Sequence, residues 1–190
     1  PYSIKKSSRR SIRKDKSLLV FTPGSYNRFA ESFFKAAVHC CNSLDCLGIL
    51  LTKYREHLPK TLPGNVMHCD YIPLDSLLPH AALLVSHGGM GTVAQALATG
   101  VPQIIMPIAF NQPDDAVRLK RMGVGDFIPP EKFNGSLLTK KTRALLSSPL
   151  VAERLRDLAG RFNGVDPIGR ACELLEELKG IDLKRKVPYL

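Results

Sequence analysis

Short apolar runs alternate with longer amphipathic segments along most of the chain. The runs are apolar at consecutive positions, which is typical of strands buried on both faces of a sheet. The longer segments repeat apolar residues at helical spacing, which predicts helices with one buried face. We expect strands at residues 17–21, 47–51, 65–71, 83–85, 103–106 and 125–128. We expect a helical turn at 74–80 and helices at 28–43, 92–99, 113–122, 136–147, 150–162 and 167–179.

This order of elements predicts the fold class. Strands that alternate with helices form a parallel sheet covered on both faces, so we expect an α/β protein with a Rossmann-like, doubly wound parallel sheet. Ligands of such folds bind beyond the carboxyl ends of the strands. Four of those ends lead into loops that carry hydroxyls, amides or open backbone, and we expect these loops to border one crevice: residues 22–25, 71–74, 87–92 and 107–112.

One of these loops is rich in glycine: His87-Gly88-Gly89-Met90-Gly91-Thr92. Glycines lack the Cβ atoms that would keep a ligand away from the main chain. A helix that begins near Gly91 or Thr92 leaves its first N–H groups without intrahelical partners. The helix dipole favours an anion there by roughly 0.3 to 2 kcal/mol. The turn has neither the dinucleotide-binding spacing nor the Gly-Lys-Ser/Thr of a P-loop, so alone it fits either a phosphate loop or a tight packing turn.

The positive charge lies mainly at the two ends of the chain. Of a net charge of +10, residues 1–16 carry +6 (seven Lys and Arg against one Asp) and residues 179–190 carry +3 (four against one). We therefore expect a basic amino-terminal tail or interdomain linker at 1–16, a folded domain at 17–180 and a basic tail at 181–190. The nearly neutral middle argues against specific binding of nucleic acid, whereas the tails suit a peripheral contact with anionic lipid.

The apolar runs are too short to span a membrane, and none follows the basic start as in a signal peptide. We therefore expect a cytoplasmic protein. Its five cysteines lie in apolar segments and are expected to be buried free thiols. No cluster of metal ligands accompanies the predicted crevice, so we expect neither a metal nor a cofactor.

Four blocks of residues carry a family resemblance: Tyr71-Ile72-Pro73, His87-Gly88-Gly89-Met90-Gly91-Thr92, Gly100-Val101-Pro102 and Asn111-Gln112-Pro113-Asp114-Asp115-Ala116. They resemble the donor-binding signature of nucleotide-sugar glycosyltransferases related to UDP-glucuronosyltransferases and UDP-glucosyltransferases. They look closest to the bacterial rhamnosyltransferase-like branch. Phe21-Thr22-Pro23-Gly24-Ser25 and the Phe33-Phe34 helix agree with that branch. The resemblance implies the carboxyl-terminal half of a two-domain GT-B enzyme, the half that binds the nucleotide sugar.

The resemblance also implies a role for residues of each loop. Tyr71 would stack on a pyrimidine base, the Ile72 backbone would contact the base edge, and Gln95 would bind the ribose. The diphosphate would be bound by Ser25, His87, Gly89, Met90, Gly91 and Thr92, and the sugar by Asn111 and Gln112. Gln95 and Asn111 stand where the family usually has Glu and Asp, which is compatible with a dTDP-sugar as well as a UDP-sugar.

By the same resemblance, the complete enzyme is an inverting, metal-independent hexosyltransferase, and the glycine-rich turn stabilises the leaving diphosphate. The acceptor pocket and the catalytic histidine of this family lie in the amino-terminal domain. We therefore expect no catalytic residue on this chain and no activity without that domain. Two alternatives stay open: a stand-alone donor subunit that docks on the acceptor subunit of an N-acetylglucosaminyltransferase, and a catalytically silent nucleotide-sugar-binding module.

Overall fold

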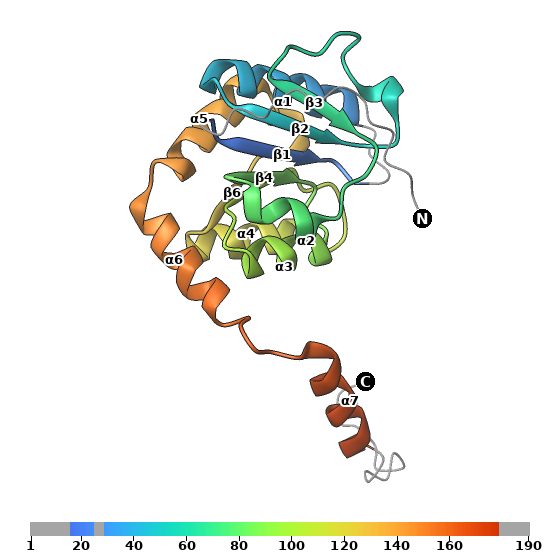
Figure 1. Ribbon diagram of the computed structural model, residues 1–190, viewed down its shortest axis with the longest axis vertical. Helices are drawn as coiled ribbons and strands as arrows, with labels where there is room; N and C mark the ends of the chain where they lie inside the picture. The colour runs from blue at the N-terminus through green and yellow to red at the C-terminus, as the bar shows by residue number, and fades with distance from the viewer. Residues whose placement is uncertain (1–15, 25–28, 179–190) are drawn as a thin grey trace.

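A six-stranded parallel sheet forms the centre of the protein (Figure 1). The computed structural model describes residues 16–24 and 29–178. The strands are β1 (Leu18–Thr22), β2 (Leu47–Leu51), β3 (Val66–Cys69), β4 (Leu83–Ser86), β5 (Gln103–Ile105) and β6 (Gly125–Phe127). Their order across the sheet is β3-β2-β1-β4-β5-β6, which is the order of a doubly wound Rossmann-like fold. The predicted fold class is confirmed.

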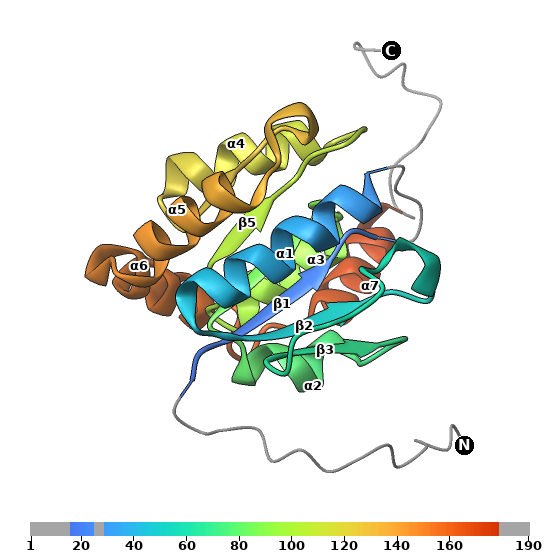
Figure 2. The same cartoon turned by 90° about the horizontal axis from the view of Figure 1, so that it is seen from above.

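Helices cover both faces of this sheet. They are α1 (Ala30–Leu44), α2 (Leu74–Leu77), α3 (Met90–Ala98), α4 (Gln112–Met122), α5 (Gly135–Leu146), α6 (Pro149–Gly160) and α7 (Pro167–Leu178). Short 3-10 turns occur at η1 (Arg55–His57), η2 (Leu78–His80) and η3 (Pro130–Lys132). Figure 2 shows α1 and α5 side by side above the sheet.

Alternate residues of β1 divide the core between the two faces. Leu19 and Phe21 pack with the aromatic residues of α1, whereas Val20 packs with residues of α2 and α3. On the α1 face, the Phe33 ring stacks on that of Phe133, with centroids 5.2 Å apart and planes 13° apart. Apolar residues on both faces of one strand explain why the sequence shows continuous rather than alternating apolar runs.

The observed elements follow the predicted ones closely, with three differences that affect the site. Helix α3 begins at Met90, before the predicted start at Gly91 or Thr92. Helix α4 begins at Gln112, one residue before Pro113. Strand β3 ends at Cys69, so Tyr71 lies beyond this strand instead of at its carboxyl end.

The last helix stands apart from the sheet in Figure 1. Every residue of α7 is exposed except Gly169, which is half-buried. Among the cysteines, Cys40, Cys41 and Cys46 are buried as expected, Cys69 is half-buried, and Cys172 on α7 is exposed. None of the helices in the described residues is both long and apolar enough to cross a bilayer. The predicted tails, 1–16 and 181–190, lie outside the described residues except for Lys16.

Candidate functional site

The adjacent strands β1 and β4 form the point where the chain changes direction across the sheet. After β1 the chain continues to β2 on one side, and after β4 it continues to β5 on the other. Thr22 pairs with Ser86, so the two strands end level and their loops begin side by side. In open α/β sheets such a switch point forms the binding crevice. The loops at 22–25 and 87–92 meet here, although Ser25 lies outside the described residues.

His87 lies between the two loops and is enclosed by glycines. A Cβ atom on Gly24 would lie 2.8 Å from the Cε1 and Nδ1 atoms of the ring. A Cβ atom on Gly89 would lie 2.9 Å from Nε2. Real Cβ atoms do not approach other atoms so closely, so the imidazole occupies this position only because both neighbours are glycine. Gly24 also has a φ of +85°, which favours glycine in its own right.

Burial lowers the pKa of His87 below its ordinary value, and the Thr22 backbone partly opposes this shift. Nδ1 of His87 is buried and has no hydrogen-bond partner among the described residues. Burial therefore favours the neutral ring, and Nδ1 remains an unused polar atom beside the glycine turn.

The three glycines of the turn differ in what surrounds them. Gly88 has a φ of +84°, and a Cβ atom there would lie 2.7 Å from Cγ2 of Ile105. Gly89 makes room for His87, as described above. At Gly91, by contrast, no heavy atom of the described residues lies within 4 Å of a Cβ position. Packing therefore explains the first two glycines and leaves the third unexplained.

Helix α3 begins at this turn without a side-chain cap. Gly89 is the N-cap residue, and no side chain of the described residues accepts a hydrogen bond from the first turn. The first intrahelical bond joins the Val93 N–H to the Gly89 carbonyl at 2.9 Å. The N–H groups of Met90, Gly91 and Thr92 therefore precede the intrahelical ladder and are open to a ligand. Open N–H groups and the positive end of the helix dipole suit an anion such as a phosphate.

The residues predicted to bind the base and the ribose lie on the loop after β3 and on α3. Tyr71 is 73% exposed, so it does not pack into the sheet. The next residue, Ile72, is half-buried and packs with the apolar cluster under α2. Gln95 is exposed one turn into α3, and its Nε2 donates to the Gly91 carbonyl at 3.2 Å. Tyr71 and Gln95 are therefore both accessible to a ligand, as their predicted roles require.

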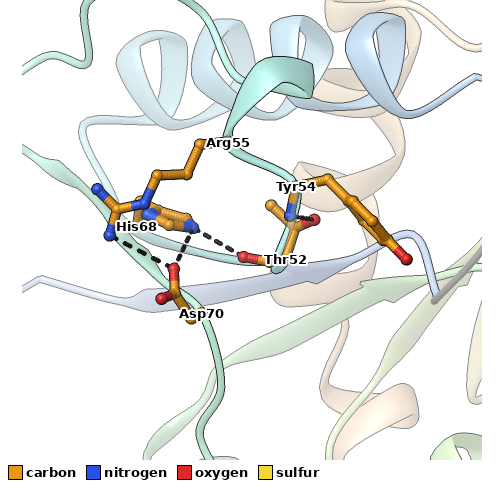
Figure 3. A network of polar contacts seen from close by, with 5 residues as sticks. All are labelled: Thr52, Tyr54, Arg55, His68 and Asp70. Carbon is orange, nitrogen blue, oxygen red and sulfur yellow. Dashed lines mark hydrogen bonds and ion pairs between the residues drawn. The ribbon is translucent and has the colours of Figure 1, made fainter.

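A polar network at the carboxyl ends of β2 and β3 was not predicted (Figure 3). Oδ1 of Asp70 lies 3.4 Å from Nη2 of Arg55 and 3.4 Å from Nε2 of His68. The same His68 nitrogen lies 2.8 Å from the Thr52 carbonyl, and the Tyr54 N–H donates to the Thr52 hydroxyl at 3.1 Å. Both neighbours of His68 Nε2 are acceptors, so this nitrogen carries a proton.

This network links the loop after β2 to the residue that precedes Tyr71. Arg55 and Asp70 are largely exposed, and an ion pair of that kind contributes about 0 to 1 kcal/mol. The ion pair therefore contributes little to the free energy of unfolding, and its main effect is to hold the loop after β2 close to Asp70. Opposite charges just after consecutive strands were the signal in the sequence that would have predicted it.

The loop after β5 carries the two residues predicted to bind a sugar. Asn111 is exposed, and its Nδ2 donates to the carboxylate of Asp115. Gln112 is buried, and its Oε1 accepts hydrogen bonds from the Ile108 N–H at 2.8 Å and the Ala109 N–H at 3.0 Å. Both residues lie at the predicted edge of the sheet. The oxygen of Gln112 holds its own loop, which the sequence did not predict.

Other hollows of the surface do not coincide with this crevice. A cavity of about 450 Å³ lies at the opposite, amino-terminal edge of the sheet, and its lining includes Ala82, Pro102 and Leu155. A second hollow of about 510 Å³ lies between α1 and the start of α5. Neither contains a predicted site residue. Across residues 16–24 and 29–178, no group of three His, Cys, Asp or Glu side chains is arranged to hold a metal ion.

Sequence comparisons show that the chain is similar to bacterial glycosyltransferases. It is 34% identical over 117 residues to O-mycaminosyltylonolide 6-deoxyallosyltransferase of Streptomyces fradiae, covering 61% of this chain and 28% of that protein. It is 30% identical over 165 residues to oleandomycin glycosyltransferase of Streptomyces antibioticus, covering 85% of this chain and 38% of that protein. The chain thus spans less than half the length of these relatives.

Structural comparisons agree with the sequence. The glycosyltransferase of kitacinnamycin matches 93% of this chain with a TM-score of 0.77 at 25% identity, and the match covers 47% of that structure. The spinosyn rhamnosyltransferase SpnG in complex with thymidine diphosphate has the same fold, with a TM-score of 0.77 at 22% identity over 87% of this chain and 46% of that structure. The predicted GT-B resemblance is confirmed, and the spinosyn rhamnosyltransferase SpnG shares the fold. Residues 43–161, more than half of the chain, match the family described as "Erythromycin biosynthesis protein CIII-like, C-terminal domain", and the chain belongs to that family.

Proposed function

We propose that this chain is the donor-binding half of a glycosyltransferase and that the crevice between β1 and β4 holds the diphosphate of a pyrimidine nucleotide sugar. The observation that carries the proposal is the uncapped start of α3, where three consecutive N–H groups follow a glycine turn at the switch point of the sheet. Family membership supports the reading of this turn as a donor site.

Each predicted residue takes a role that its position allows. His87, Gly89, Met90, Gly91 and Thr92 bind the diphosphate, together with Ser25, which lies outside the described residues. Exposed Tyr71 stacks on the base beside the Ile72 backbone. Gln95 binds the ribose, and Asn111 and Gln112 bind the sugar. Oε1 of Gln112 also fixes the loop at 107–112, called the sugar loop below. The thymidine diphosphate complex of SpnG supports dTDP as the nucleotide, with UDP as the other candidate.

The proposed reaction is an inverting, metal-independent transfer. An acceptor hydroxyl oxygen forms a bond to the anomeric carbon while the bond from that carbon to the diphosphate oxygen breaks, and the hydroxyl proton passes to a base outside this chain. Negative charge grows on the leaving diphosphate. The N–H groups of Met90, Gly91 and Thr92 and the α3 dipole are already in place to stabilise that charge, so little reorganisation is needed.

The partner of this half is an acceptor-binding domain or subunit, without which we expect no transfer. The relatives are more than twice as long as the matched part of this chain, which supports such a partner. The exposed apolar residues of α7, which include Ile168 at 77% and Leu175 at 64%, also suit a helix that another domain covers.

Titration calorimetry with dTDP and UDP, together with thermal unfolding, tests the donor site. Ligand at one hundred times its dissociation constant should stabilise the domain by about 2.7 kcal/mol. His87→Ala should weaken dTDP binding about tenfold or more without unfolding the domain. His80→Ala, at an exposed histidine of η2, is the matched control and should bind like the wild type. If no nucleoside diphosphate gives heat or thermal stabilisation at millimolar concentration, the donor-site proposal is wrong.

A further inference from the structure

Phe110 combines a strained backbone with an exposed side chain at the edge of the proposed site. Its φ is +58°, and its side chain is 93% exposed. Among the described residues, the one other non-glycine residue with positive φ is Asp45, which ends α1 as its C-cap. Aspartate tolerates this left-handed conformation, and a C-cap favours it. Phenylalanine does not tolerate this conformation as aspartate does, and Phe110 does not end a helix. A backbone outlier of this kind points to a functional constraint.

The loop around Phe110 is held by its polar groups. Buried Gln112 accepts hydrogen bonds from the backbone of Ile108 and Ala109, and its own N–H donates to the Ala109 carbonyl at 3.2 Å. Asn111 is tied to Asp115 by its side chain and by its carbonyl, which accepts the Asp115 N–H at 3.0 Å. The side-chain oxygen of Gln112 and the side-chain nitrogen of Asn111 are therefore both engaged within the loop. What the loop presents outward is an aromatic ring.

The position of this ring relates it to the donor sugar. Strand β5 is the neighbour of β4, so the loop after β5 begins beside the turn proposed to bind the diphosphate. Phe110 directly precedes Asn111, the residue proposed to bind the sugar. A sugar hydroxyl placed against the ring would lose its hydrogen bonds to water, and the aromatic ring has no polar atom to replace them. A sugar carbon that carries no hydroxyl could pack against the Phe110 ring without losing hydrogen bonds to water.

We propose that Phe110 is a specificity-determining residue whose ring packs against a deoxygenated face of the donor sugar. This inference rests on the proposed function and adds how the site selects among donors. The ring favours deoxyhexoses over fully hydroxylated hexoses by contact with their apolar face. The strained, hydrogen-bonded loop holds the ring in place before the ligand arrives, so little ordering is required on binding.

Calorimetry on the 190-residue chain with dTDP, dTDP-glucose and the 2-deoxy and 6-deoxy analogues of dTDP-glucose tests this role. The wild type should bind at least one deoxy analogue about tenfold more tightly than dTDP-glucose. Phe110→Gly should abolish that preference while leaving the affinity for dTDP unchanged, and its melting temperature should not fall because glycine adopts a positive φ readily. Phe110→Leu, which keeps an apolar side chain, should retain part of the preference. Phe162→Ala, at another exposed phenylalanine after α6, should behave like the wild type.

Each outcome separates this inference from the proposed function. A wild-type chain that binds dTDP but does not distinguish the sugars, or a Phe110→Gly variant that keeps the full preference, overturns the role of Phe110 alone. Such a result would indicate that the ring contacts the acceptor or the acceptor-binding half. A wild-type chain that binds none of the four ligands overturns the donor site and this inference together.

Discussion

The substitution Gly91→Ala, which adds one methyl group, tests whether the glycine-rich turn binds a ligand or only allows tight packing. Because no described heavy atom outside the two chain neighbours and the backbone of α3 lies within 4 Å of a Cβ at this position, the substitution Gly91→Ala causes no clash in the free protein. Alanine is better than glycine inside a helix by about 1 kcal/mol. In the first turn of α3 we expect roughly half of that, about 0.5 kcal/mol of stabilisation. For a domain of this size that raises the melting temperature by about 1 to 2 °C.

The same methyl group should weaken diphosphate binding. It would stand beside the open N–H groups of Met90, Gly91 and Thr92, where a phosphate oxygen must approach within hydrogen-bond distance. We expect at least a tenfold loss of dTDP affinity, which corresponds to about 1.4 kcal/mol. Stability and affinity should therefore change in opposite directions, a combination that damage to the fold does not produce.

Two further alanine variants make the test specific. Gly160 at the end of α6 also has open space around its Cβ position, so Gly160→Ala should leave dTDP binding unchanged without any packing penalty. Gly89 has a φ of −62° and a ψ of 135°, which alanine adopts readily, but its Cβ would press on His87. Gly89→Ala should therefore lower both stability and affinity. If Gly91→Ala binds dTDP as tightly as the wild type, the first turn of α3 is not where the diphosphate binds.

The remaining predictions concern the two loops that flank this turn and the histidine between them. Gly24→Ala should lower the free energy of unfolding by about 1 to 3 kcal/mol in denaturant titrations, because it combines a φ of +85° with a 2.8 Å approach to His87. Gln112→Ala should cost about 1 to 3 kcal/mol by leaving two backbone N–H groups without their acceptor, whereas Asn111→Ala, at an exposed side chain, should change stability by less than about 0.5 kcal/mol. The lowered pKa of His87 means that its contribution to stability is present above pH 6.5, the ordinary value, and is lost as the pH falls below it; His87→Ala should remove this dependence from thermal unfolding curves. A bound diphosphate favours the charged ring, so dTDP affinity should rise as the pH falls through the same range, and a pH-independent affinity would exclude contact between His87 and the phosphates.

The sheet could be predicted from the sequence because its strands are buried on both faces. Leu83, Leu84 and Val85 are all fully buried, and three consecutive apolar residues leave little choice of structure between two turns. The start of α3 was harder to predict. A helix start is usually recognised by a capping side chain, and here the N-cap is Gly89 with no side-chain cap at all. The missing cap that displaced the predicted boundary is also what leaves the N–H groups open to a ligand.

The sugar loop shows why residue type alone did not predict what each side chain contacts. A glutamine can direct its oxygen to a ligand or to nearby backbone N–H groups, and the sequence does not distinguish the two. In the turn at 107–112, the Ile108 and Ala109 N–H groups both donate to Oε1 of Gln112. Once that acceptor is used, the oxygen of Gln112 is internal to the loop, and the exposed side chains include Asn111 and Phe110. In our proposal the family motif marks where the sugar lies, and selection among sugars depends on Phe110, which directly precedes the motif residue Asn111 and whose positive φ only the folded loop reveals.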